Sequence, residues 1–193
     1  PSIATRGAAV VWKRTTDTDN AWRGWAGPQF AASYRPVLRT GNDIRDVDIC
    51  TTPGTQTPIA MVKDSAELRT RKMNMDTMEF SASVIVATTA ARSASICALP
   101  DDTALVFVAD VSNGLSKAYK STNDGATWAA WSDDIFPDGQ PTDAPTSFRV
   151  RYQEGQMIAV YETSASGGQI TTYSSADFGQ TFQGVSTFAG TAV

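Results

Sequence analysis

The residues able to do chemistry are few and of limited kinds. Histidine, the commonest general base and a common metal ligand, is absent, and two cysteines without histidine cannot build a zinc site. Carboxylates remain: Asp43, Asp46 and Asp48 on one segment, and Asp133 with Asp134 on another. Two carboxylates flanking a scissile bond are what a glycoside hydrolase needs. A turn role accounts equally well for Asp133 and Asp134, which follow a predicted strand.

A short polar pattern recurs along the chain. Residues 121–128 read STNDGATW and residues 175–182 read SADFGQTF, 54 residues apart. Both fit the pattern Ser, any residue, Asp or Asn, any residue, Gly, any residue, Thr, aromatic. Residues 15–22, TTDTDNAW, fit in the same register 106 residues before the copy at 121, with Asp19 in place of the glycine. Residues 73–80, MNMDTMEF, are the candidate for the intervening copy and keep little more than the final aromatic.

The residue types in this pattern are those of a tight turn. Gly125 and Gly179 can take a positive φ, and Asn123 and Asp177 can bond the backbone of their own turn. The closing aromatic side chains are large enough to bury a substantial area between neighbouring units. The candidate structural residues are Thr15, Asp17 and Trp22; Ser121, Asn123, Gly125, Thr127 and Trp128; and Ser175, Asp177, Gly179, Thr181 and Phe182.

Short alternating segments bounded by Gly, Pro, Asn and Asp surround each copy and predict strands joined by hairpins. No helix longer than two turns is expected between residues 47 and 182. The expected strands are Val47–Cys50, Ile59–Lys63, Leu68–Lys72, Ser93–Ala98, Ala104–Ala109, Leu115–Lys120, Phe148–Tyr152, Met157–Glu162 and Ile170–Ser174.

Four strands in a repeat of about 50 residues indicate an all-β fold, a β-propeller or partial propeller of about three to four antiparallel blades. We expect a single domain over residues 1–193, with a partial blade at 1–34 and blades at 35–86, 87–138 and 139–193. In the partial blade, residues 8–13 are expected to be the third strand, and the fourth begins near Trp22.

The octapeptide resembles the Asp-box, or BNR repeat, of the sialidase-like β-propellers. The resemblance is closest at Ser175–Phe182; at Ser121–Trp128, Asn123 takes the Asp position. It implies that each box forms the turn between the third and fourth strands of a blade, on the outer rim, where its role is structural. It also implies the settings in which such repeats occur, which are phage tails, virion surfaces and secreted bacterial proteins. The run of acidic residues at 17–19 is not a calcium loop, because the Glu at the twelfth position is missing.

A sialidase would need arginines converging on a carboxylate, a Tyr–Glu pair and an acid. The sequence offers guanidinium groups but nothing that brings them together, and it contains only four Glu residues. We therefore expect no catalytic residue, and a truncated sialidase-like or other glycoside hydrolase is the alternative. The arginines that offer such groups include Arg23, Arg39, Arg45, Arg69, Arg71, Arg92, Arg149 and Arg151.

Two tryptophans outside the turns are candidate contacts for a glycan or a protein partner. Trp25 and Trp131 stand at equal offsets after their octapeptides, and exposed aromatic rings stack on sugars. Cys50 and Cys97 fall in the same strand of successive units, 47 residues apart. Equivalent positions of adjacent blades lie farther apart than paired strands, so we expect two buried free thiols.

Composition and net charge limit the classes of partner that the chain is expected to bind. A net charge of −4 without a basic block argues against nucleic-acid binding. The longest apolar run, Ala104–Ala109, is too short to span a bilayer, and PSIATRGAAV at the start shows no signal peptide. No cofactor and no metal are expected. The sequence thus predicts a non-enzymatic structural or binding module of a larger assembly, extracellular or on a virion surface, with other protein chains as partners and glycans as candidate ligands.

Overall fold

The computed structural model describes residues 44–74, 76–77, 79–89, 91–110, 115–137, 145–163 and 168–189, together with the strand backbones 8–13, 22–27 and 37–39. Every regular element in these residues is a β-strand. The all-β class follows from short alternating segments, which cannot present one apolar stripe with a helical period.

The strands form antiparallel sheets from consecutive stretches of chain. Sheet 1 contains β1 (Ala8–Lys13), β2 (Trp22–Gly27) and β3 (Val37–Arg39). Sheet 2 contains β4 (Asp46–Thr51), β5 (Pro58–Lys63), β6 (Glu67–Asn74), β7 (Glu79–Phe80) and β8 (Val84–Thr88). Sheet 3 contains β9 (Ser93–Ala98), β10 (Ala104–Asp110), β11 (Leu115–Ser121) and β12 (Ala129–Ser132). Sheet 4 contains β13 (Pro145–Gln153), β14 (Gln156–Thr163), β15 (Gln169–Ser175) and β16 (Gln183–Ala189).

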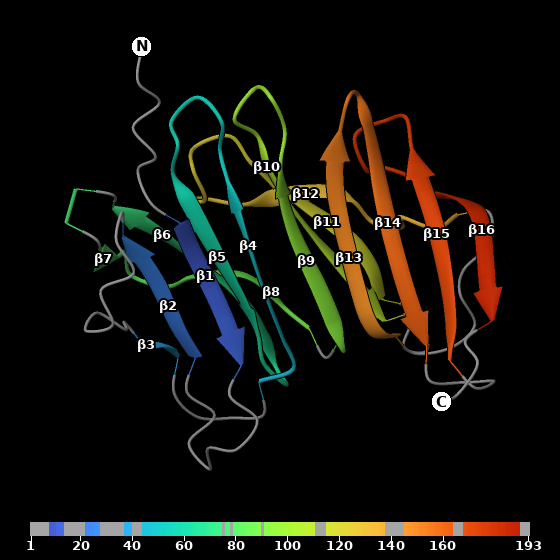
Figure 1. Cartoon of the computed structure of the whole chain (residues 1–193), viewed down its shortest axis with the longest axis horizontal. Helices are drawn as coiled ribbons and strands as arrows, with labels where there is room; N and C mark the ends of the chain where they lie inside the picture. Colours follow the sequence, from blue (N-terminus) through green and yellow to red (C-terminus); the bar gives the residue numbers. More distant parts are fainter. Residues whose placement is uncertain are drawn as a thin grey trace.

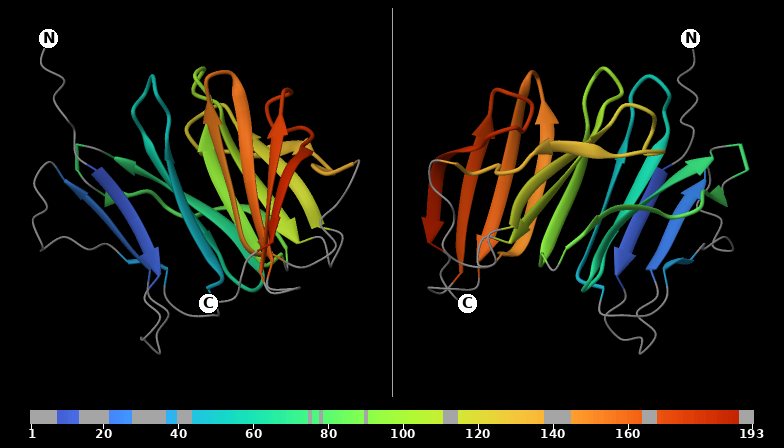
Figure 2. Two further views of the ribbon diagram at one scale, coloured as in Figure 1. Left: turned by 45° about the vertical axis from the view of Figure 1, so that its right-hand side comes forward. Right: turned by 180° about the vertical axis from the view of Figure 1, so that it is seen from behind.

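The four sheets stand side by side in chain order as an open arc, a partial propeller (Figures 1 and 2). Their first strands form the inner side of this arc, because β1 lies against β4, β4 against β9, and β9 against β13. In sheets 3 and 4 the strands follow one another outwards in sequence order. In sheet 2 the outermost position is shared by β7 and β8, which both pair with β6.

The nine expected strands are confirmed, each within a few residues of the expected limits. The first sheet differs from expectation in two respects. The strand at 37–39 pairs with β2, so this sheet extends past residue 34. The strand at 8–13 lies at the inner position against β4, where we expected a third strand. An alternating segment has the same pattern at any position in a sheet, so its order is decided by its neighbours.

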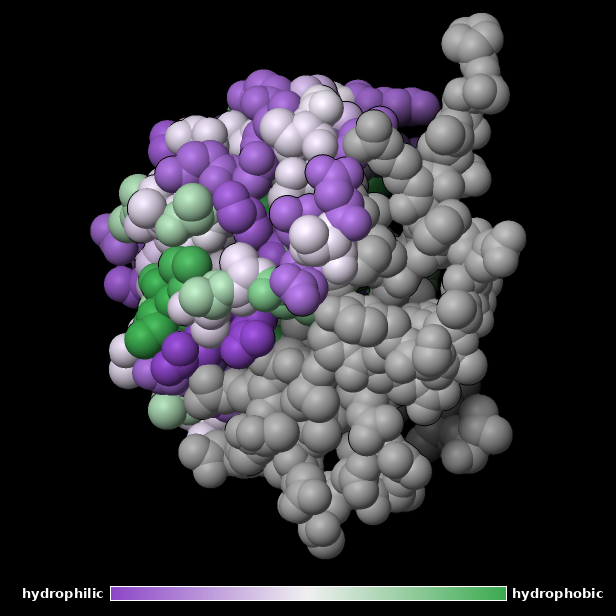
Figure 3. Space-filling model, turned by 90° about the vertical axis from the view of Figure 1, so that its left-hand side faces the viewer, coloured by the Kyte–Doolittle hydropathy of each residue, from purple (hydrophilic) through white to green (hydrophobic). Residues whose placement is uncertain are grey.

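The main core lies between sheets 3 and 4. Phe136, from the segment that leaves β12, is fully buried there with Phe107, Phe148 and Tyr161. A second cluster, including Ile59 and Val106, joins sheets 2 and 3. From the side of sheets 1 and 2, the described surface is mainly hydrophilic with a small hydrophobic patch (Figure 3). The rigid scaffold for any site is therefore the packed block of sheets 2 to 4.

Candidate functional site

The turn between β15 and β16 is closed by its own side chains. The Ser175 hydroxyl accepts a hydrogen bond from the Gly179 amide at 2.8 Å and donates to Asp177 at 2.7 Å. Asp177 also accepts from the Thr181 amide at 2.9 Å and from the Thr181 hydroxyl at 2.6 Å. Burial raises the pKa of Asp177, but the bonds from Thr181 and Ser175 outweigh it and hold that pKa below its ordinary value.

The turn between β11 and β12 is built in the same way. The Ser121 hydroxyl accepts from the Gly125 amide at 2.9 Å and donates to Asn123 Oδ1 at 2.9 Å. Asn123 Oδ1 accepts from the Thr127 amide at 2.9 Å, and its Nδ2 donates to the Thr127 hydroxyl at 2.8 Å. Gly125 and Gly179 have φ of 76° and 79°, so both turns place glycine where the backbone is left-handed.

The closing aromatic side chains of the two turns pack on the preceding sheet. Phe182 is 2% exposed and meets Phe107 of β10 edge to face, with ring centres 5.7 Å apart. Trp128 donates its indole N–H to the Thr70 hydroxyl of β6 at 2.9 Å. Each turn therefore joins its own sheet to the previous one.

The earlier copies of the pattern are less informative. Thr15 and Asp17 lie outside the described residues, and Trp22 and Trp25 are described only as backbone positions in β2. At residues 73–80 the chain turns between β6 and β7, and Asn74 accepts from the amides of Asp76 and Thr77 at 2.8 and 3.2 Å.

A ladder of ion pairs crosses the inner strands of sheets 2 to 4. Asp46 of β4 and Arg149 of β13 are 103 residues apart and form a bidentate salt bridge, with N···O distances of 2.6 and 2.9 Å. Between them, the Ser93 hydroxyl of β9 donates to Asp46, as does the Ala94 amide at 3.2 Å. The Ser93 hydroxyl also accepts from the Phe148 amide at 3.0 Å, so one rung ties three sheets together.

A second rung repeats this arrangement two residues along each strand. Arg151 donates twice to Asp48, both times at 2.9 Å, and the Ser95 hydroxyl donates to Asp48 at 2.7 Å. Burial is the largest single influence on Arg149 and lowers its pKa, but the hydrogen bond to Asp46 and the negative charges of Asp46 and Asp48 together outweigh burial, so the net shift of the pKa is upward. For Arg151 the hydrogen bond to Asp48 is the largest cause of a raised pKa. Both guanidinium groups are therefore held as cations by carboxylates of this chain.

The ladder was not predicted, although the sequence carries a sign of it. The inner strands hold DVD, SAS and RVR, three repeats of one residue type at alternate positions. Alternate residues of a strand lie on one face, so such repeats stack along an inter-sheet seam. The partners become visible only when β4, β9 and β13 are known to be neighbours.

A cavity of about 490 Å³ opens between the turns of sheets 3 and 4. It is formed by the β9–β10 turn, the outer end of β11, β12, the end of β13 and the β15–β16 turn. Three aromatic residues and one lysine are among its lining residues, which are Leu99, Pro100, Asp101, Thr103, Leu105, Lys120, Thr122, Trp131, Tyr152 and Phe178.

The Trp131 side chain of this pocket is held in place by specific contacts. Trp131 donates its indole N–H to the carbonyl of Phe178 at 3.1 Å, across the two sheets. The Lys120 ammonium lies 4.0 Å from the centre of the Trp131 ring. Phe178 is 46% exposed and has φ of 56°, an uncommon conformation for a non-glycine residue that its turn imposes.

The structure thus places one of the two candidate tryptophans, Trp131, in a pocket. Sequence reasoning missed its companions Lys120, Tyr152 and Phe178. Phe178 occupies a variable position of the octapeptide, and Tyr152 ends a strand, so neither is marked by a pattern. Only the packing of sheet 4 on sheet 3 brings them beside Trp131.

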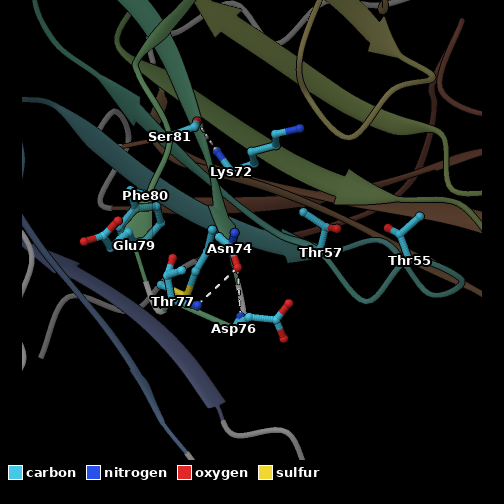
Figure 4. Close-up of a pocket in the computed structure, with 10 residues that line it drawn as sticks. Thr55, Thr57, Lys72, Asn74, Asp76, Thr77, Glu79, Phe80 and Ser81 are labelled. Atoms are coloured by element: carbon cyan, nitrogen blue, oxygen red, sulfur yellow. Dashed lines mark hydrogen bonds between the residues drawn. The ribbon is translucent and has the colours of Figure 1, made fainter.

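A second cavity, of about 560 Å³, lies at the outer end of sheet 2 (Figure 4). Thr55 and Thr57 of the β4–β5 turn face it from one side, and the β6–β7 turn closes the other. Among the described lining residues Phe80 is the one aromatic residue, and most of the others are polar. The lining residues are Thr55, Thr57, Lys72, Met73, Asn74, Asp76, Thr77, Glu79, Phe80 and Ser81.

Both cysteines are free thiols, with Cys97 buried and Cys50 partly exposed. Burial raises the pKa of both thiols, that of Cys97 to about 12, so neither is a thiolate at neutral pH. Within the described residues no group of acidic or cysteine side chains could hold a metal ion. In the same part of the chain, no helix is long and apolar enough to cross a membrane.

Comparison with known proteins identifies the fold. No protein-family model matches the chain, and no curated protein sequence does. Among solved structures, the Aleuria aurantia lectin in complex with Fucα1-6GlcNAc is similar, with a TM-score of 0.58, 9% identity, and coverage of 94% of this chain and 57% of the lectin. The Hadza microbial sialidase Hz136 has a TM-score of 0.56 and 12% identity, with coverage of 92% and 42%. The NanB sialidase of Streptococcus pneumoniae has a TM-score of 0.54 and 12% identity, with coverage of 88% and 28%.

These likenesses show an all-β fold of the propeller type shared with a fucose-binding lectin and with sialidases. The chain spans little more than half of the lectin and less than half of either sialidase. It is therefore a partial propeller in comparison with these neighbours.

Proposed function

We propose that this chain is a non-catalytic glycan-binding module whose site is the pocket between sheets 3 and 4. The observation that carries the proposal is the convergence of Trp131, Tyr152 and Phe178 with Lys120 on one cavity of about 490 Å³. This volume is within the range of small-ligand sites, and the combination of aromatic rings with a few polar groups is typical of them.

The pocket has the chemistry that a sugar ring requires. A pyranose has an apolar C–H face, which packs on an aromatic ring, and a rim of hydroxyl groups, which need donors and acceptors. Trp131, Tyr152 and Phe178 supply the rings. Lys120 supplies a charged donor, and Asp101, another lining residue, supplies a carboxylate acceptor. The hydrogen bond between the Trp131 indole and the Phe178 carbonyl fixes the platform before a ligand arrives, which lowers the entropy lost on binding.

The charged residues of the inner strands favour glycan binding over glycoside hydrolysis. The arginines at the inner strands are Arg149 and Arg151, and each is neutralised by a carboxylate of the chain itself. Asp46 and Asp48, which we considered as catalytic carboxylates, are these partners. Both carboxylates are buried and already accept hydrogen bonds from an arginine, a serine and a backbone amide, so neither is presented to a substrate as the carboxylates of a glycoside hydrolase must be. Asp43, the third candidate on that segment, lies outside the described residues.

The site of action that we propose follows from the proposed class of ligand, a glycan. Glycans recognised by such pockets are displayed on cell surfaces, so we propose an extracellular site of action. The lectin neighbour is described with a fucosylated disaccharide, and its likeness to this chain supports the fold alone. Placement on a virion or phage tail stays a prediction from the resemblance of the octapeptide repeats.

A glycan array followed by calorimetry tests the proposal. Trp131→Ala and Lys120→Ala should each weaken binding of the best array ligand by roughly 10–30-fold, the loss typical of a central contact. Lys117→Ala is the matched control, because Lys117 lies on the same strand, outside the pocket, and should bind as the wild type does.

The same samples should leave fluorogenic α-sialosides, fucosides and other glycosides intact. No array signal, or equal affinity of Trp131→Ala and the wild type, would refute the binding site. Glycoside hydrolysis abolished by Asp46→Asn or Asp48→Asn would establish the hydrolase alternative instead.

A further inference from the structure

The polar cavity of about 560 Å³ lies where the octapeptide pattern is most altered, at residues 73–80 of sheet 2. In sheets 3 and 4 the turn glycines Gly125 and Gly179 lie so close to the preceding sheet that an added Cβ would contact it. At residues 73–80 the glycine position holds Thr77, and the closing aromatic residue is the partly buried Phe80. Both of these residues line the cavity. The cavity is therefore a feature of the altered turn.

Both walls of this cavity are fixed by hydrogen bonds within the chain. In the β4–β5 turn, the Thr55 hydroxyl donates to Asp124 at 2.8 Å, which ties this wall to the β11–β12 turn of sheet 3. In the opposite wall, the Ser81 hydroxyl accepts from the Lys72 amide at 3.1 Å, and the Ser81 amide donates to the Lys72 carbonyl at 2.8 Å. Walls that are ordered before a ligand arrives reduce the entropy lost on binding.

The charged side chains that line the cavity have both signs. In Figure 4 the side chains of Lys72 and Asp76 extend toward the side on which Thr55 and Thr57 lie. Glu79 is the second acidic residue of the lining. All three charged residues are exposed, and within the described part of the chain none of them takes part in an ion pair. Their hydrogen-bonding capacity is therefore open to a ligand.

This lining favours one class of ligand over others. A phosphate or another dianion would meet two carboxylates for one ammonium group. A metal ion needs a group of acidic or similar donors, and the described residues contain no such group. A flat apolar ligand would find one aromatic ring, that of Phe80. A neutral molecule rich in hydroxyl groups is matched, because carboxylates accept from its hydroxyls while ammonium and threonine hydroxyl groups donate to its oxygens.

We propose that this cavity is a second binding site of the chain, for a neutral, hydroxyl-rich sugar unit, and that the module is bivalent. The two sites share no lining residue, and polar groups provide the contacts here in place of aromatic rings. The bivalence rests on the proposed function, whereas the second site is independent of the aromatic pocket. When both sites reach sugars on one surface, the apparent affinity rises by roughly 10²–10⁴-fold over a single site.

Titration of the isotope-labelled full chain with methyl glycosides of neutral hexoses, followed by NMR, tests the second site. We expect saturable shifts of the amide signals of Thr57 and Thr77, separate from any shift of the Trp131 indole signal. Asp76→Ala and Lys72→Ala should each weaken binding at this site roughly 10-fold or more, because each removes a hydrogen bond to a charged group. Both side chains are exposed, so the fold should be retained.

Asp133→Ala is the matched control, because it removes an exposed carboxylate that lines neither cavity and should leave all titrations unchanged. If the glycosides leave the Thr57 and Thr77 amides unshifted, the second site is overturned whatever the Trp131 signal shows, and the proposed function keeps its own test. Shifts confined to the sheet 2 cavity would support the second site without the aromatic pocket. Shifts produced by glycine or inorganic phosphate but not by the glycosides would overturn the ligand class.

A surface coated densely with the sugar bound in the titration tests the bivalence. The wild type should bind this surface far more tightly than it binds the same sugar in solution. Asp76→Ala and Trp131→Ala should each reduce the affinity for the surface to that of a single site. Equal retention of the wild type and Asp76→Ala on the surface would show that the two sites do not act together.

Discussion

The ion-pair ladder gives the most direct test of how the sheets are held together. We predict that Asp46→Asn, which keeps the size of the side chain and removes its charge, lowers the free energy of unfolding by about 2–3 kcal/mol. Asp46 is 9% exposed at its side chain and accepts from Arg149, from Ser93 and from the Ala94 amide. Removing one partner of a fully buried pair costs about 3–5 kcal/mol. The Arg149 side chain is 37% exposed and can be partly rehydrated, which reduces the loss.

Urea unfolding followed by tryptophan fluorescence gives this quantity, and a double-mutant cycle with Arg149→Met isolates the pair. We expect a coupling energy of about 1.5–3 kcal/mol, the range for hydrogen bonds between charged groups. The pair Lys117–Asp133 provides the control: its atoms are 3.4 Å apart and its side chains are 40% and 88% exposed. Coupling there should be below about 1 kcal/mol. If both pairs coupled equally, or Asp46→Asn cost less than about 1 kcal/mol, the ladder would not join the sheets as argued.

The remaining predictions concern the turn between β15 and β16. Phe182→Ala should lower the free energy of unfolding by about 3–5 kcal/mol, because a side chain that is 2% exposed leaves a cavity; a loss below about 1 kcal/mol in urea unfolding would contradict this. Gly179→Ala should lower the free energy of unfolding clearly more than Gly155→Ala. Both glycines have a positive φ, but a Cβ at 179 would lie 2.6 Å from the Phe107 ring, while a Cβ at 155 would meet nothing within 4 Å. Equal losses of stability would exclude the clash. Asp177→Asn should make the melting temperature fall less steeply at acid pH than it does in the wild type. The wild-type carboxylate stabilises the fold above its ordinary pKa of 3.8, and this stabilisation is lost as the pH falls through the lowered pKa of the folded state. If the melting temperatures of both proteins fell equally at acid pH, Asp177 would make no such contribution.

Local patterns were sufficient for the elements of this fold. The segment 156–163 alternates exposed and buried residues along its whole length, and alternation of this kind is visible in sequence because neighbouring side chains of a strand point to opposite faces. The turn at 175–182 could likewise be expected from its residue types, since Ser175, Asp177 and Gly179 act within a few residues of each other. The order of strands within the first sheet could not, because the strand at 8–13 carries no mark of its position.

The aromatic pocket between sheets 3 and 4 could be predicted from the sequence only in part. Trp131 was a candidate from its place after a turn, while Tyr152 and Phe178 had no distinguishing neighbours in sequence. They meet Trp131 because sheet 4 packs on sheet 3 through an aromatic cluster around Phe136. The identity of a binding surface depends on that packing, and local propensity contains no information about it.

Local residue patterns were enough to predict the all-β class, the repeat of about 50 residues, the strands and the turn chemistry, because each depends on interactions over a few residues. Which charges pair with each other depends on the tertiary structure instead. Asp46 and Arg149 are 103 residues apart, and their pairing exists because three inner strands from successive sheets lie side by side. The same arrangement makes Asp46 and Asp48, two of the candidate catalytic carboxylates, the partners of Arg149 and Arg151.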